Sequence, residues 1–230
     1  MSAETFNLLE TELRSLNDRL HHLDLAKDPD HFIVEEPRGK HNIACGLTDE
    51  ITVDIKGHAG YYCAGMNQRA TLTIHGNCGV GVAENMMSGT VRVEGSASQS
   101  AGATGNGGLL VINGNAAARC GISMKGIDIV VRGSVGHLSA FMAQAGNLVV
   151  CGDAGDSLGD SIYEAKLFVA GEVKSLGADC IEKEMRPEHL ETVTVLLKQA
   201  GIDDVDPKSF KRYGSERKLY NFNIDNADKY

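Results

Sequence analysis

The sequence is poor in aromatic residues, in proline and in long apolar runs. It has no tryptophan, only four prolines, and aromatic side chains at 5% of its 230 positions. No apolar stretch approaches the roughly 20 residues that a membrane-spanning helix requires, and no signal-peptide pattern stands at its start. From these absences we expect a cytoplasmic protein without membrane segments.

Positive charge and paired cysteines are also scarce. The formal net charge is −9, which argues against nucleic acid or an anionic membrane as the main partner. The six cysteines include no CxxC pair, so the spacing favours reduced, buried thiols over a metal site or a disulfide framework.

Motifs for catalysis are missing as well. The sequence has no nucleophile motif, phosphate-binding loop or zinc signature, and it therefore predicts no catalytic, cofactor-binding or metal-binding residue in this chain. His58, beside Tyr61 and Tyr62, makes the best polar cluster, and we expect it to be structural. Calcium-binding β-helices repeat every nine residues, a period that is absent here.

Glycine, by contrast, is abundant, and much of it is periodic. Of 27 glycines, seven recur at a spacing of 19 residues. They are Gly57, Gly76, Gly95, Gly114, Gly133, Gly152 and Gly171. A fixed period over seven copies is the signature of a solenoid, in which each repeat is one coil stacked on the next.

Aliphatic residues stand at fixed distances before each glycine. The positions four and two residues before it are aliphatic in every repeat, as with Leu110 and Ile112 before Gly114. Side chains alternate faces along a strand, so these two positions point together into a core. Each repeat is thus predicted to be a short strand that ends at a glycine, where the chain bends and can need a positive φ.

Seven residues after each glycine only alanine or glycine occurs, which suits a narrow, closely packed interior. We predict an all-β fold: a single-stranded, right-handed parallel β-helix of seven 19-residue coils over residues 45–185, with short helices at both ends. The right-handed sense is inferred because 19 is not a multiple of the six-residue repeat of left-handed β-helices.

The flanking segments divide the chain into three parts. Residues 1–44 contain an amphipathic helix over 5–22, with Thr5 as its N-cap, followed by a linker. Residues 186–230 contain a helix from Pro187 to about Ala200, which Gly201 ends, and then a basic and aromatic tail. We expect the two helices to plug or flank the solenoid, because its open ends expose strand edges and core.

One outward-facing row turns apolar in the later coils. Three residues before the glycine stand Val111, Val130, Val149 and Phe168, and such an apolar ladder must be covered. Two covers are open: the C-terminal helix or a partner subunit. Arg212, Tyr213 and Tyr220 in the tail are the other candidate interface residues, because arginine and aromatic side chains dominate interface energetics.

The repeat resembles a known domain. Segments such as LTIHGNCGVGVAENMMSG and LVVCGDAGDSLGDSIYEA are similar to the GXGXG domain at the C-terminus of the glutamate synthase large subunit, and the similarity covers residues 45–185. The resemblance implies a right-handed β-helix that braces amidotransferase and flavin domains without chemistry of its own.

Because the repeat fills most of the chain, the closest resemblance is to a free-standing β-helix subunit, that of N-methylglutamate synthase (methylamine–glutamate N-methyltransferase). This implies a non-catalytic scaffold in a cytoplasmic heteromeric transferase, with an amidotransferase-like subunit and a flavin/iron–sulfur subunit as partners. FMN and the iron–sulfur cluster are expected in the partner, and no cofactor in this chain.

Three alternatives stay open. Two are the β-helix subunits of a split glutamate synthase and of formylmethanofuran dehydrogenase, which share the repeat. The third, from a different class, is a homo-oligomeric structural β-helix built on the apolar ladder.

Overall fold

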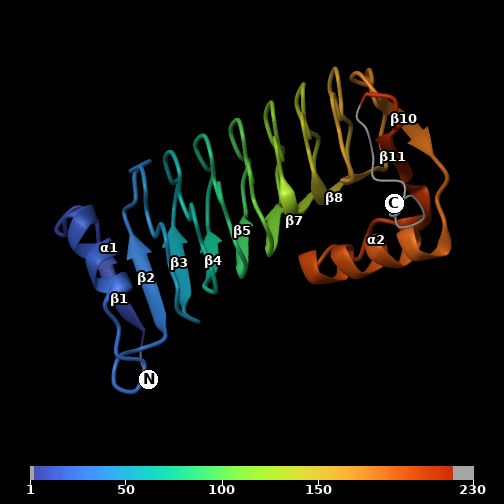
Figure 1. The fold of residues 1–230 in the computed structure, drawn as a ribbon. Helices are drawn as coiled ribbons and strands as arrows, with labels where there is room; N and C mark the ends of the chain where they lie inside the picture. The colour runs from blue at the N-terminus through green and yellow to red at the C-terminus, as the bar shows by residue number, and fades with distance from the viewer. Residues whose placement is uncertain (1–2, 220–230) are drawn as a thin grey trace.

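The computed structural model describes residues 3–219 and shows a solenoid flanked by two helices (Figure 1). One sheet of 11 strands runs the length of the molecule in the order β1-β2-β3-β4-β5-β6-β7-β8-β9-β11-β10. The strands are β1 Glu4–Asn7, β2 His31–Glu35, β3 Thr52–Lys56, β4 Thr71–Ile74, β5 Thr90–Val93, β6 Leu109–Ile112, β7 Lys125–Val131, β8 Ala145–Val150, β9 Lys166–Val169, β10 Cys180–Lys183 and β11 Lys211–Ser215.

The 19-residue period of the sequence sets the register in which neighbouring strands of the sheet pair. Neighbouring strands from β3 to β9 are parallel, and their aligned residues are 19 apart, from Val53 opposite Leu72 to Leu148 opposite Leu167, except where a bulge in β7 sets Lys125 opposite Ala145. Side chains of this row and of the row at Ile55 are buried in one continuous core. The β-solenoid predicted from the glycine spacing is therefore confirmed.

The seven glycines are required by close stacking more than by backbone conformation. Among them only Gly57 has a positive φ, of 144°, so the other six do not use the positive φ that glycine permits at a bend. A Cβ on Gly114 would lie 2.7 Å from the carbonyl oxygen of Gly95 in the previous coil. Its N–H donates to that same oxygen at 2.8 Å. The coils approach too closely at this corner for any side chain.

Left-handed backbone occurs instead in the row that holds only alanine and glycine. Ala83, Gly102, Gly121 and Ala140 have φ values between 55° and 68°. The interior there is tight, and a larger or branched side chain would add steric cost to the left-handed conformation. The small residues were attributed to interior volume alone, whereas the backbone conformation is a second and independent reason.

The stack begins earlier than the sequence predicted. β2 pairs in parallel with β3, with Val34 opposite Ile55, so part of the expected linker forms a first coil. The expected helix over 5–22 is also corrected: residues 4–7 form β1, parallel to β2, and α1 spans only Leu13–His21. Thr5 is a strand residue and not an N-cap. Pairing with an open strand edge outweighs the helical spacing of the leucines.

α1 closes the N-terminal end of the core. Leu16 and Leu20 are buried in it. The Asn17 side chain donates to the carbonyl of Asn42 at 2.8 Å and accepts from the N–H of Ala44 at 2.9 Å, so it binds backbone groups of the first coil. The expectation that the N-terminal helix plugs the solenoid is confirmed.

α2, Pro187–Ala200, lies along the outer face of the later strands (Figure 1). Gly201 ends it with φ 74°, as predicted. Val193, Leu196 and Leu197 pack on the outward row of the sheet in a second hydrophobic cluster. Arg92 on β5 donates to the carbonyls of Gln199 and Ala200 at 3.1 and 2.6 Å, which satisfies the last turn of the helix.

The start of the C-terminal tail is part of the sheet. β11 lies between β9 and β10 and is antiparallel to both, so it covers the last strand of the stack. Within residues 3–219, neither helix has the length and apolar character needed to cross a bilayer.

Candidate functional site: the open end of the solenoid

The residues predicted as an interface lie inside the molecule. Val111, Val130, Val149 and Phe168 each have no exposed surface, because α2 covers them. The cover is therefore the chain's own helix, and the ladder is not a partner surface. Arg212 and Tyr213 are only 7% and 5% exposed because β11 is an inner strand of the sheet, and Tyr220 lies outside the described residues.

A second ladder, of side-chain oxygen and nitrogen acceptors, was missed by sequence reasoning. The residue after each repeat glycine accepts the backbone N–H of the same position in the next coil, as Asn115 Oδ1 does from Ser134 at 2.8 Å. We call this row the acceptor ladder; its members are His58, Asn77, Ser96, Asn115, Ser134, Asp153 and Glu172. The signal was present, since six of the seven carry a short side chain or a carboxylate that can cap backbone donors.

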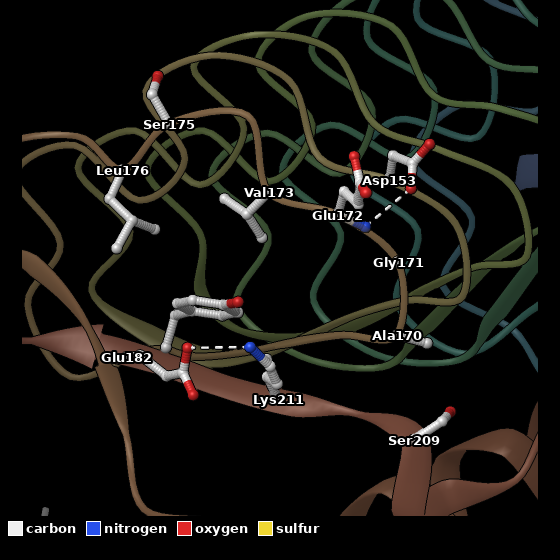
Figure 2. Close-up of a pocket in the computed structure, with 11 residues that line it drawn as sticks. Asp153, Ala170, Gly171, Glu172, Val173, Ser175, Leu176, Glu182, Ser209 and Lys211 are labelled. Carbon is white, nitrogen blue, oxygen red and sulfur yellow. Dashed lines mark hydrogen bonds and ion pairs between the residues drawn. The ribbon is translucent and has the colours of Figure 1, made fainter.

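The acceptor ladder ends at Glu172, in the last coil. Asp153 Oδ1 accepts the Glu172 N–H at 2.8 Å (Figure 2), but in the described part of the chain no later coil follows to place an N–H against the Glu172 carboxylate. The next residue, Val173, pairs only with Ala154 among the described residues. On this side of the solenoid the stack therefore ends on a strand edge that is ready to accept another strand.

A cleft of about 720 Å³ lies beside this edge. We call it the end cleft; Glu172, Val173 and Leu176 of the last coil line one wall, and Glu182, Lys211 and Tyr213 of β10 and β11 line the other. Figure 2 shows the two walls facing each other, with the 3.4 Å ion pair between Lys211 on β11 and Glu182 on β10. The cleft combines exposed backbone, apolar side chains and carboxylates, a lining suited to binding an extended peptide.

His58, which the sequence singled out, and two aspartates of the later coils all have structural partners. His58 begins the acceptor ladder, with Nδ1 accepting from the N–H of Asn77 at 2.9 Å. Asp156 pairs with Lys174 at 2.7 Å, and Asp160 Oδ2 accepts the N–H of Ala178. Across residues 3–219, no group of three or more histidine, cysteine or acidic side chains is arranged to hold a metal ion.

The most strongly perturbed carboxylate lies on the outer face near the other end of the stack. Burial by itself would raise the pKa of Asp54, but hydrogen bonds from His75, His31 and Lys56 outweigh it and lower that pKa to about 2. His31 Nε2 lies 2.8 Å from the carboxylate and Lys56 Nζ 3.1 Å. These four side chains come from three neighbouring coils, so the cluster ties the coils together.

The six cysteines are free thiols. Burial raises the pKa of Cys120 to about 12 and that of Cys45 to about 11. A hydrogen bond with Cys78, together with burial, holds the pKa of Cys63 well above its ordinary value. Thiols with such raised pKa values are protonated at neutral pH and are poor nucleophiles.

Comparison with known proteins places the chain in a family. No protein-family model matches the sequence. The curated protein GlxC of Rhizobium meliloti (strain 1021) is 66% identical over 224 residues, which cover 97% of this chain and 98% of that protein. At that coverage both helices and the end cleft lie within the aligned region. The chain belongs to the GlxC family.

Proposed function

We propose that the chain is the non-catalytic scaffold subunit of a glutamate-synthase-like flavoenzyme complex, and that the complex is N-methylglutamate synthase. The complex would convert methylamine and glutamate into N-methylglutamate and ammonia. The chain would brace an amidotransferase-like subunit and a subunit that carries FMN and an iron–sulfur cluster. Its part is to hold the two catalytic subunits at a fixed separation, so that a small amine passes between their sites.

The end cleft is the observation that carries the scaffold role. The solenoid satisfies its own backbone coil by coil and covers its apolar ladder with α2. At Glu172 and Val173 the stacking stops, beside a cleft large enough for several residues of an extended chain. A partner strand seated there would continue the acceptor ladder and pair with Val173, which is recognition by strand addition.

The rigidity of the solenoid also supports the scaffold role. Eight parallel strands, β2 to β9, follow one another without a break, and at a spacing of ~4.8 Å they span roughly 34 Å. Every coil from β3 onward is tied to its neighbours by strand pairing and by the acceptor ladder. A stack of this kind keeps the distance between its two ends fixed.

Co-purification tests the proposal. The tagged chain is co-expressed with candidate amidotransferase-like and flavin-barrel chains from the same genome, and we expect all three to elute together with N-methylglutamate-forming activity. Leu176→Arg, which places a charged side chain in the end cleft, should release at least one partner. Val195→Arg is the matched control, because Val195 is 45% exposed on α2 and lies outside the end cleft.

Two results would count against the proposal. A chain that stays monodisperse and binds neither candidate would remove the scaffold role altogether. A stable three-chain complex that forms N-methylglutamate but ignores Leu176→Arg would keep the scaffold role and reject the end cleft as its docking site.

A further inference from the structure

Three cationic side chains from neighbouring strands face one small cavity at the C-terminal end of the sheet. Lys166 lies on β9, Arg212 on β11 and Lys183 on β10, and all three line a cavity of about 30 Å³. Arg212 stands opposite both Phe168 and Lys183 in the strand register. Because side chains two residues apart share a face, Lys166 lies on the same outer face as these two cations.

These cations have no carboxylate partner in the described part of the chain. Arg212 is 7% exposed, and its Nε donates to the carbonyl of Glu184 at 3.0 Å. Lys183 Nζ donates to the carbonyl of Ser215 at 2.9 Å. Glu164 also lines the cavity, yet within residues 3–219 no acidic oxygen lies within 4.0 Å of the charged atoms of the three. Buried charges are normally paired, so the site is short of negative charge.

Burial and neighbouring positive charges lower the pKa values of Lys183 and Arg212. Burial, together with the nearby charges of Arg212 and Arg217, lowers the pKa of Lys183. Burial and the charge of Arg186 lower the pKa of Arg212. The chain as a whole has a net charge of −9, so this accumulation of positive charge is local. An anion in the cavity would relieve the repulsion.

Gly214 keeps the floor of the cavity open. A Cβ built on Gly214 would meet no atom closer than 3.8 Å, the distance to Lys183 Cγ and Cδ. The glycine is therefore not forced by close stacking, unlike the repeat glycines. A methyl group at this position would occupy space in the cavity without a clash.

We propose that this cavity binds a carboxylate group, with Arg212 as its principal ligand and Lys166 and Lys183 beside it. The planar guanidinium matches a carboxylate with two parallel hydrogen bonds. A volume of about 30 Å³ exceeds the roughly 10–15 Å³ that one water requires, and it suits a group of a few atoms. A free small carboxylic acid and the acidic side chain of a bound protein share this chemistry.

The test uses the full-length chain at low ionic strength, because screening weakens such contacts. Acetate, succinate, inorganic phosphate and a tri-glutamate peptide with both ends blocked are titrated against the chain and followed by calorimetry and melting temperature. The variants are Gly214→Ala, which fills the floor, and Lys198→Gln as control. Lys198 is exposed on α2 and lines neither this cavity nor the end cleft.

We expect a carboxylate probe to bind the wild-type chain and Lys198→Gln equally, and Gly214→Ala at least fivefold more weakly with an unchanged melting temperature. Binding of acetate or succinate identifies a free acid as the source; binding of the peptide alone identifies an acidic side chain. Three results would overturn the proposal: tighter binding of phosphate than of any carboxylate, equal binding by all three proteins, or no binding of any probe.

Discussion

The repeat glycines owe their identity to neighbours in the previous coil. Six of the seven have ordinary φ, yet a Cβ on any of those six would come within 3.0 Å of the glycine carbonyl group below it. Real Cβ atoms do not approach backbone so closely, so the coils would have to separate locally. The cost therefore falls on the stack as a whole, because neighbouring coils share these contacts.

Gly114→Ala, which adds a single methyl group, tests whether close stacking of the coils requires glycine here. We expect it to lower stability by about 1–3 kcal/mol, the range of overpacked core positions. Asn113→Ala, one residue away and partly exposed, should cost less than about 1 kcal/mol. Urea denaturation of both variants measures the difference, and equal midpoints would show that the corner can relax.

The Asp54 cluster makes a prediction about pH. Because the pKa of Asp54 is lowered from 3.8 to about 2 in the folded chain, the carboxylate contributes stability above pH 4, and this contribution is lost as the pH falls through 2. Asp54→Asn should therefore destabilise the chain by about 1–2 kcal/mol at pH 7. The difference from wild type should shrink between pH 4 and pH 2. A difference that is constant down to pH 2 would contradict the account.

Among the elements, α2 is the one whose role the sequence did not decide: either α2 or a partner subunit could cover the apolar row. The apolar row from Val111 to Phe168 required a cover, but a row shows only that something packs there. The structure places Val193, Leu196 and Leu197 on it. The choice between a helix of the same chain and a partner depends on where the chain turns after β10, and no local pattern encodes that turn.

Leu197→Ala is the corresponding prediction. Leu197 is 2% exposed within the second hydrophobic cluster, so its truncation should cost about 2–4 kcal/mol. Val195→Ala, at a position 45% exposed on the same helix, should stay within about 0.5 kcal/mol of wild type. Chemical denaturation followed by circular dichroism measures both. Similar losses for the two variants would mean that α2 does not hold the ladder.

The elements that could be predicted from the sequence are those whose sequence signal is local or repeated. The strands from β3 to β9 and α2 were predictable because period, β-branching and the Pro187 and Gly201 boundaries repeat a pattern or cap an element. β1, β2 and β11 were not, because none of them is followed by a glycine of the 19-residue repeat. The end cleft escaped for the same reason: one of its walls comes from β10 and β11, beyond the repeat.

The molecule as a whole is a rod whose two ends differ. The N-terminal end is plugged by α1, with Leu16 and Leu20 in the core. Within residues 3–219, β11 closes the C-terminal end on one face only, which leaves Glu172 and Val173 at an open edge. This asymmetry favours one strand-adding partner at one end over an endless head-to-tail stack of copies.

The central claim is that a partner strand continues the stack at the end cleft. Hydrogen–deuterium exchange of the isolated chain and of the three-chain complex tests it most directly, amide by amide. We predict that Val173 and its neighbours over 172–176 exchange quickly in the isolated chain and become protected in the complex. The inner coil around Ala116 should be protected in both. Unchanged fast exchange at 172–176 in a complex with assembled partners would contradict the account.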